Sequence, residues 1–414
     1  ILEKHLFTVM TSFANKFEIL SCNQYGFVSG KGTQCLLEDF SDLIHTAFDR
    51  NLFTCAIFLD LAKAFDTVNH TILLNKLYNY GFRGQFQSLL SSFFSDRSQV
   101  VSGGNFRSSR VILKAGVPQG SVLSPLLFNL YVNDMSDRVV GCRIFQYADD
   151  TVLAARHLNF SDALRLLSND ASRLMDWFGE NLISINKSKT KLVCFRNPLK
   201  CIDYGSPFLL HRTNCPDCTC RPLELVDNVK YLGVFFDSDM AWNSHLSYVC
   251  GKLRSVSCLL YNCKVFMPFS VRKSVAHALG YSILRYGVTI FGECSNQWHI
   301  RVDRILKALL NSVAYSVDHS SALSVFEMLQ MPTFRSLFRE SVVLRHFWCD
   351  DFKNPSLSPV HLRNPSRFII PRCFTRYGKR VRSHYVPVIF NKLPPHIFEA
   401  SGKRKLKKLL RSLV

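Results

Sequence analysis

Three acidic residues stand at the ends of apolar, strand-like segments, where carboxylates can hold metal ions. Asp149 and Asp150 separate two apolar runs, residues 143–148 and 151–155, which predict a hairpin with both acids at its turn. Asp60 ends the apolar run that starts at Cys55. Burying carboxylates next to so much apolar sequence costs free energy unless a cation binds them. Together the three acids indicate an oxygen-only site suited to paired Mg²⁺ ions and phosphoryl transfer.

Some of these acids also have a purely structural interpretation. An Asp-Asp pair in a hairpin can be ordinary turn chemistry. The chain after Asp60 is expected to turn helical, and Asp66 could cap a further helix over residues 71–78. Asp60 itself has no such role, and this favours the metal-binding interpretation.

A loop punctuated by glycine and proline, residues 115–121, leads into a predicted helix between the two acidic segments. Ser121 or Ser124 is expected to cap this helix, with Pro125 in its first turn. Gln119 and Gly120 allow close backbone approach and hydrogen bonding to a base pair or a sugar. The alternative is a plain loop-to-helix junction.

The composition favours a nucleic-acid partner. The chain has 51 Lys and Arg against 31 Asp and Glu, a formal net charge of +20 and a pI near 9.4. Phosphate neutralisation supplies much of the affinity of such proteins for nucleic acids, although a membrane-surface or ribosomal protein would fit the charge equally well. At 414 residues and 47% hydrophobic residues, two or three globular domains are expected.

No apolar run approaches the roughly 18 residues that span a bilayer, and the start lacks a signal-peptide layout. The 15 scattered cysteines are typical of buried thiols. An intracellular location, in the nucleus or the cytoplasm or both, is therefore predicted, with no membrane partner. Cys215, Cys218 and Cys220 could seed a zinc site with His211 or Cys201, but a polar surface loop is the favoured interpretation.

Taken in order, five segments resemble the palm of a reverse transcriptase of the non-LTR (LINE-type) retrotransposons. They are FLDLAKAFDTVNH (58–70), GVPQGSVLSPLLFNLYVNDM (116–135), FQYADDTVLAA (145–155), WFGENLISINKSKTKLVCF (177–195) and VKYLGVFFDSDMAWNSHL (229–246). NQYGFVSGKGTQ (23–34) is similar to the glycine-rich fingers segment of that group. The resemblance is strong from Asn23 to His245 and weaker beyond.

The resemblance implies a role for individual residues. Asp60, Asp149 and Asp150, with the backbone carbonyl of Leu61, would hold two Mg²⁺ ions, for which Mn²⁺ could substitute. The other implied assignments are a lysine that protonates pyrophosphate (Lys189), a nucleotide pocket (Phe65 as the gate against a ribose 2′-hydroxyl, Gln119, Gly120, Tyr147) and a primer grip (Tyr231, Leu232, Gly233). The partners implied are an RNA template, a DNA primer and dNTPs. Phe65 could instead be a core residue and Lys189 a solvated charge.

The implied fold is α+β: a right-hand polymerase palm, an antiparallel sheet with helices on one face. The expected divisions are partial fingers (1–55), palm (56–240), a helical thumb-like domain (241–345) and a basic C-terminal region (346–414). Amphipathic helices are predicted from His245 to Lys264, from Ser270 to Tyr286 and from Gln297 to Val317. The basic segment from Ser401 to Arg411 is expected to lie on RNA as a helix or to act as a nuclear-import signal.

The chain departs from the family pattern in two ways. It begins just ahead of the glycine-rich fingers segment, so we expect it to be the C-terminal part of a longer polyprotein, as a fragment or a decayed copy. Val28 stands where the family has a basic residue, with Lys31 nearby. The alternatives are a non-catalytic RNA-binding remnant, a domesticated host protein or a group II intron-type maturase. The YLGVFFD segment and the long basic C-terminal region favour the LINE-type interpretation over the maturase.

Overall fold

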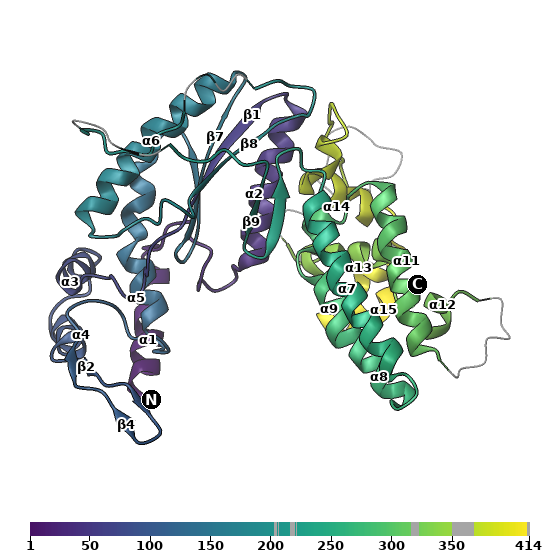
Figure 1. Ribbon diagram of the computed structural model, residues 1–414, viewed down its shortest axis with the longest axis horizontal. Helices are drawn as coiled ribbons and strands as arrows, with labels where there is room; N and C mark the ends of the chain where they lie inside the picture. Colours follow the sequence, from purple (N-terminus) through teal and green to yellow (C-terminus); the bar gives the residue numbers. More distant parts are fainter. Residues whose placement is uncertain are drawn as a thin grey trace. The chain divides into compact units, whose positions relative to one another are not determined.

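The chain folds into two compact units, described here from a computed structural model (Figure 1). The first unit comprises residues 1–36 and 52–227, and the second comprises residues 37–51 and 228–414. The structure describes residues 1–202, 205, 207–215, 220, 222–315, 323–349 and 368–411. The four divisions expected from the sequence stay a prediction.

A four-stranded antiparallel sheet forms the centre of the first unit. Its strands are β6 (Arg143–Tyr147), β7 (Asp150–His157), β1 (Phe53–Leu59) and β8 (Lys191–Phe195), in the order β6-β7-β1-β8. The predicted hairpin and the predicted strand before Asp60 are both confirmed. Together with the many helices, the sheet confirms the α+β class.

The central strand β1 is buried along its whole length and has a hydrogen-bonded neighbour on each side. Side chains of a strand alternate between the two faces of a sheet. Phe53, Cys55, Ile57 and Leu59 therefore share one face, and all four belong to the main apolar core of the unit. The helices α5 (Ser124–Tyr131) and α6 (Phe160–Glu180) contribute to the same core, and α6 packs on β1 and β7.

The remaining helices of the first unit surround this core. They are α1 (Leu2–Lys16), α3 (His70–Asn79), α4 (Gln85–Phe94) and η1 (Asn133–Arg138). Four short strands accompany them as two pairs, β2 (Ser98–Gln99) with β5 (Val111–Ile112) and β3 (Ser102–Gly103) with β4 (Phe106–Arg107). Helix α2 (Thr33–Asp49) begins in the first unit, and its residues from Leu37 onward belong to the second.

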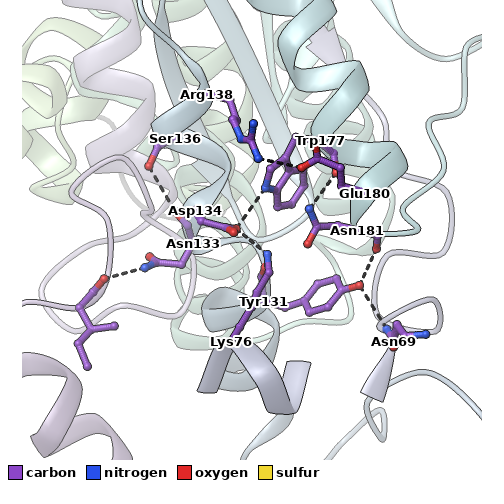
Figure 2. A network of polar contacts seen from close by, with 11 residues as sticks. Asn69, Lys76, Tyr131, Asn133, Asp134, Ser136, Arg138, Trp177, Glu180 and Asn181 are labelled. Carbon is purple, nitrogen blue, oxygen red and sulfur yellow. Dashed lines mark hydrogen bonds and ion pairs between the residues drawn. The ribbon is translucent and has the colours of Figure 1, made fainter. Parts of the chain in front are cut away.

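A polar network around Lys76 ties α3, the end of α5, η1 and α6 together (Figure 2). The Lys76 Nζ donates to the Tyr131 carbonyl at 2.8 Å and to Asp134 Oδ1 at 2.6 Å. The Trp177 Nε1 donates to the same Asp134 oxygen at 3.2 Å, and Tyr131 Oη donates to the Asn181 carbonyl. Burial lowers the pKa of Lys76, opposed by its hydrogen bond to Asp134. The network therefore holds a half-buried charge by pairing it.

Three local expectations from the sequence are wrong. Asn69, and not Asp66, caps α3, because the Asn69 side chain accepts the Ile72 N–H at 3.0 Å. Residues 62–66 form turns instead of a helix, since Lys63 has a φ of 50°, which a right-handed helix excludes.

The cap of α5 also differs from the expectation. Ser124 donates to the Pro118 carbonyl at 2.6 Å, and neither serine caps α5 by a side-chain hydrogen bond. Leu123 holds the N-cap position instead. Pro125 does lie in the first turn, as predicted.

The second unit is mainly helical. It contains the hairpin β9 (Asn228–Tyr231) and β10 (Val234–Asp237) and the predicted helices, which are confirmed as α7 (Asn243–Cys263), α8 (Phe269–Val275), η2 (Ala276–Tyr281), α9 (Ser282–Arg285) and α11 (Asn296–Val313). Residues 316 and 317 of the third expected helix lie outside the described residues. The other helices are α10 (Val288–Phe291), α12 (Val325–Leu329), α13 (Phe334–His346), η4 (Gly378–Arg380), α14 (Arg382–Phe390), η5 (Pro395–Glu399) and α15 (Lys403–Arg411).

Glu38 on α2 lies at the centre of a buried ion cluster in the second unit. It accepts a hydrogen bond from Thr289 Oγ1 at 2.5 Å, pairs with Arg345 at 2.6 Å and lies 3.7 Å from Arg382. Arg382 also pairs with Asp39 at 2.8 Å. Burial raises the pKa of Glu38, and the arginines oppose that rise. The cluster fastens α2 to α13 and α14 within the unit.

The basic segment near the end of the chain forms α15, which packs on α13 and η5. Its buried residues are Leu406 and Leu410, whereas Lys403, Arg404, Lys405 and Lys408 are exposed. The helix therefore presents a basic face to solvent. None of the helices in the described part of the chain is long and apolar enough to cross a membrane.

We predict that His45→Leu stabilises the protein in acid. His45 is fully buried, and neither ring nitrogen has a hydrogen-bond partner among the described residues. Burial, helped by Arg380, lowers the pKa of His45 from 6.5 to about 3. The unfolded state thus binds a proton that the folded state rejects, so stability is complete above pH 6.5 and falls as the pH drops toward 3.

The free energy of unfolding, measured by urea titration at pH 7 and pH 4.5, tests this prediction. The variant is expected to recover about 2 kcal/mol of the acid-induced loss at pH 4.5. The exposed His5 on α1 supplies the control, since His5→Leu should leave the acid dependence unchanged. Equal pH dependence in His45→Leu and wild type would contradict the prediction.

Candidate active site

The register of the central strands brings Asp60 next to Asp150. Leu59, the last residue of β1, pairs with Thr151, the second residue of β7. Asp60 directly follows Leu59, and Asp150 directly precedes Thr151. Two acids that the sequence separates by 90 positions therefore meet at one end of an antiparallel pair.

The turn of the β6-β7 hairpin carries Asp149. Tyr147 pairs with Asp150, so Ala148 and Asp149 form the two-residue connection. Ala148 has a φ of 53° and is buried, whereas Asp149 is half-buried and Asp150 is exposed. The tight turn thus directs the two acids toward the end of the sheet where Asp60 lies, as the sequence predicts.

Partial burial and neighbouring charges both act on the pKa of Asp150. Loss of hydration, followed by the negative charges of Asp149 and Asp60, raises the pKa of Asp150 from 3.8 to about 6. The side chain still reaches solvent, so water screens part of this repulsion. The negative charge of each ionised carboxylate disfavours ionisation of its neighbour, and a bound cation would offset this repulsion.

The surroundings of Asp60 fix its backbone and bring a lysine close. The Asn186 N–H donates to the Asp60 carbonyl at 2.8 Å, and the Asp60 N–H donates to Thr190 Oγ1 at 3.4 Å. Leu61, proposed as a carbonyl ligand, is buried and forms a bridge with Ile185. The Lys189 Nζ lies 3.9 Å from Asp60 Oδ2, with 69% of its side chain exposed. The structure therefore brings Lys189 to the carboxylates as a solvated charge.

The loop before α5 folds back onto the turn after β1. The Gly116 N–H donates to the Val68 carbonyl at 2.8 Å, and Gly116 has a φ of +92°. A Cβ there would lie 2.9 Å from the Asp66 carbonyl oxygen, so only glycine fits. The Gln119 Nε2 donates to Asp66 Oδ1 at 2.9 Å. Gln119 and Gly120 are both exposed and available to a ligand.

Two aromatic residues flank these elements. Phe65 is half-buried, and its ring stacks on Phe128 of α5 with centroids 4.5 Å apart. It is thus anchored in the core on one side and open on the other. Tyr147 is half-buried at the end of β6, with the Phe27 ring 6.5 Å away.

The donor set fits a hard divalent cation, although the side chains alone do not enclose one. Among the described residues, no three His, Cys, Asp or Glu side chains converge closely enough to hold an ion by themselves. Mg²⁺ usually takes only one or two carboxylates and completes its shell with water and substrate phosphates. The strand-end acids, with their mutual repulsion, match that incomplete type of site.

The residues expected to grip the primer belong to the second unit. Tyr231 is buried and lies edge-on to Phe40 at 6.0 Å. Leu232 and Gly233 form the turn between β9 and β10, with φ values of 43° and 82°. The Tyr286 hydroxyl donates to the Leu232 carbonyl at 2.5 Å. These three residues therefore lie at the turn of a hairpin, and their role in primer binding stays a prediction.

The cysteine cluster is only partly described by the structure. Cys218 lies outside the described residues, and Cys220 Sγ accepts a contact from Lys187 Nζ at 3.8 Å. None of the cysteines in the described part of the chain forms a disulfide. The zinc hypothesis therefore stays a prediction.

Two residues at the site were not singled out from the sequence. Gln24 accepts a hydrogen bond from the Ala148 N–H, in the turn before Asp149, at 3.1 Å. Glu3 of α1 accepts hydrogen bonds from Ser121 Oγ at 2.8 Å and from the Val122 N–H at 3.1 Å, just after the Gln119 loop. The sequence offered one signal for Gln24, an amide side chain two positions before Gly26. It offered no signal for Glu3.

Comparison with known proteins identifies relatives of the chain. The family described as "Reverse transcriptase (RNA-dependent DNA polymerase)" matches residues 1–236. The chain is 28% identical over 313 residues to "Probable RNA-directed DNA polymerase from transposon BS" of Drosophila melanogaster, covering 72% of this chain and 33% of that protein. It is 30% identical over 380 residues to "RNA-directed DNA polymerase from mobile element jockey" of Drosophila funebris, covering 87% of this chain and 39% of that protein.

The chain therefore spans a third to two fifths of the length of these relatives. Among solved structures, a telomerase from Candida albicans, in complex with a fragment of telomeric RNA, matches with a TM-score of 0.46 at 12% identity, covering 80% of this chain and 58% of that chain. The relatives named above are polymerases of non-LTR retrotransposons, and since the family match covers more than half of the chain, we conclude that this chain belongs to the reverse transcriptase family.

Proposed function

We propose that this chain is the polymerase part of a non-LTR retrotransposon protein and adds dNTPs to a primer 3′-hydroxyl under the direction of an RNA template. The observation that carries the proposal is the meeting of Asp60 with Asp150 at paired strand ends, beside the turn that holds Asp149. Enzymes of this family are generally metal-dependent. The proposed cofactors are two Mg²⁺ ions, with Mn²⁺ as a substitute.

Asp60, Asp149 and Asp150, with the Leu61 carbonyl, would hold the ions. When bound, such a pair activates the attacking oxygen and stabilises the charge that develops on the leaving pyrophosphate. The raised pKa of Asp150 supports this assignment, because the crowded acids gain most from a cation. In a metal-loaded site the carboxylates also fix where the reacting phosphate lies.

Other residues of the first unit would position the nucleotide and move a proton. Gln119 and Gly120, which are exposed beside Asp66, would contact the incoming nucleotide, and Tyr147 would line its pocket. Phe65 would exclude a ribose 2′-hydroxyl. Lys189, 3.9 Å from Asp60, would deliver a proton to the pyrophosphate oxygen as the bond to the α-phosphate breaks.

The second unit would bind the template–primer duplex. Its exposed cations on α7 and α11 include Lys252, Arg254, Arg301, Arg304 and Lys307. Arg272 differs from these, because it is buried and donates to the carbonyls of Lys264 and Tyr315. Tyr231, Leu232 and Gly233 would hold the primer end. Such a protein would work where its RNA and DNA partners are found, in the nucleus or the cytoplasm.

Replacing both acids of the turn should abolish synthesis. We expect Asp149→Asn/Asp150→Asn to lower primer extension on poly(rA)/oligo(dT) with Mg²⁺ by roughly 10³-fold or more, since the ligands that neutralise transition-state charge are lost. The measurement is incorporation of labelled dTTP by wild type and variant. Because the substitution relieves repulsion, the variant should melt at the same temperature as wild type or higher, which separates this loss from misfolding.

The competing hypothesis is a non-catalytic RNA-binding remnant. It predicts no incorporation by wild type, together with salt-sensitive RNA binding that the double substitution leaves intact. Extension by wild type that survives the double substitution would contradict the assignment of the carboxylates.

Mg²⁺ should stabilise the wild-type protein and not the double variant. At a Mg²⁺ concentration about tenfold above its Kd, the free energy of unfolding is expected to rise by about 1.4 kcal/mol at pH 7.5. The gain should shrink below pH 6, where Asp150, whose pKa is raised to about 6, becomes neutral and stops acting as a ligand. Thermal unfolding with MgCl₂ or with KCl at equal ionic strength measures both effects, and an equal gain in the double variant would rule out binding at these acids.

Shortening the proposed gate should admit ribonucleotides. We expect Phe65→Val to lower the preference for dTTP over UTP by about 10- to 100-fold, because a smaller side chain leaves room for the 2′-hydroxyl. Single-nucleotide incorporation with each substrate gives the ratio. The control is Phe86→Val, which removes a partly buried ring from α4. An unchanged dTTP-to-UTP ratio in Phe65→Val would show that Phe65 is a core residue and does not act as the gate.

A further inference from the structure

Residues 23–25 pair with the hairpin that carries Asp149 and Asp150. The Tyr25 N–H donates to the Gln146 carbonyl at 2.8 Å, and the Gln146 N–H donates to the Asn23 carbonyl at 3.0 Å. Gln24 and Gln146 thereby form a parallel bridge on β6, the strand at the edge of the sheet. The contact ends one residue before Tyr147, where the turn begins.

The Gln24 side chain reaches beyond this bridge to the turn itself. Its Oε1 accepts the Gly26 N–H at 2.8 Å and the Ala148 N–H at 3.1 Å. Both partners are donors, so the oxygen of the amide, and not its NH₂ group, must face them. Gln24 is only 2% exposed, which means that water does not compete for these bonds.

The geometry around Gly26 holds Gln24 in place. The Asn129 Nδ2, from the buried helix α5, donates to the Gly26 carbonyl at 2.8 Å. A Cβ on Gly26 would lie 2.5 Å from the Ala148 nitrogen, so the two backbones approach as closely as glycine permits. A chain of contacts therefore leads from the core through Gly26 and Gln24 to the residue directly before Asp149.

We propose that Gln24 is a positioning residue of the active site, whose side-chain oxygen fixes the turn that presents Asp149 and Asp150. Ala148 adopts a left-handed conformation, and its buried N–H would lose its acceptor without Gln24. The two acids that follow Ala148 repel one another, and this repulsion favours distortion of the turn. Displacing catalytic groups by about 1 Å can cost on the order of 100-fold in rate.

The alternative is that Gln24 merely supports the fold, and Gln146 supplies a matched control for it. Gln146 is the same residue type, is 1% exposed and forms the other half of the same bridge. In contrast to Gln24, neither atom of its side-chain amide has a hydrogen-bond partner among the described residues. Replacing Gln146 by Leu therefore changes polarity at the same place without removing a bond to the turn.

The test compares Gln24→Leu with Gln146→Leu by hydrogen–deuterium exchange resolved to single amides. In Gln24→Leu we expect the Ala148 amide to exchange about tenfold faster, with the amides of Val152 to Ala155 in β7 unchanged. Gln146→Leu should leave both regions as in wild type. If Gln24→Leu does not fold, Gln24→Asn, which shortens the amide side chain by one methylene, takes its place with the same expectation.

The kinetic part of the test rests on the proposed polymerase function. Gln24→Leu should lower kcat for dTTP incorporation by about tenfold or more with little change in KM, whereas Gln146→Leu should not. Absence of incorporation by wild type would overturn the polymerase assignment and leave the exchange test valid. Unchanged protection of Ala148 in Gln24→Leu, or equal loss of protection along all of β7, would overturn the positioning role.

Discussion

Mutual repulsion among Asp60, Asp149 and Asp150 at one end of an apolar sheet is the constraint around which the first unit is organised. The sheet can hold these charges together only because its register is firmly set. Strand β1 is buried throughout and pairs on both sides. A slip of one residue would exchange its side chains between the two faces of the sheet and disrupt the packing on both. The packing of β1 thus holds the register that keeps Asp60 next to Asp150.

Polar contacts to the backbone complete what the register begins. Asn186 and Thr190 fix the backbone of Asp60, and Gln24 fixes the turn before Asp149. None of these contacts occupies the Asp149 or Asp150 carboxylate. The protein therefore restrains the positions of these two acids while leaving their oxygens for ligands, which is the arrangement that a preorganised site requires.

The sequence predicted the elements whose signals are local and failed where distant partners decide. The hairpin at Asp149 and the strand before Asp60 follow from alternation and apolar runs. The turn at Lys63 does not, because lysine ordinarily favours helix and the turn is bonded to distant segments, with the Ala62 N–H donating to the Ser184 carbonyl and the Val117 N–H to the Phe65 carbonyl. Gln24 could not be assigned from its neighbours, since its acceptor contact to Ala148 spans 124 positions.

The two units treat their charges in opposite ways, and this difference bears on the net charge of +20. In the second unit the acids of α2 are neutralised internally, with Glu38, Asp39 and Asp42 all paired to Arg382. Exposed cations on α7, α11 and α15 are left facing water, some of them over aromatic rings, such as Arg301 over Trp298 at 4.8 Å. In the first unit, by contrast, Asp149 and Asp150 share one tight turn beside Asp60, and their repulsion contributes to the raised pKa of Asp150. A cation at these acids would relieve that repulsion, whereas in the second unit the arginines already neutralise the acids of α2.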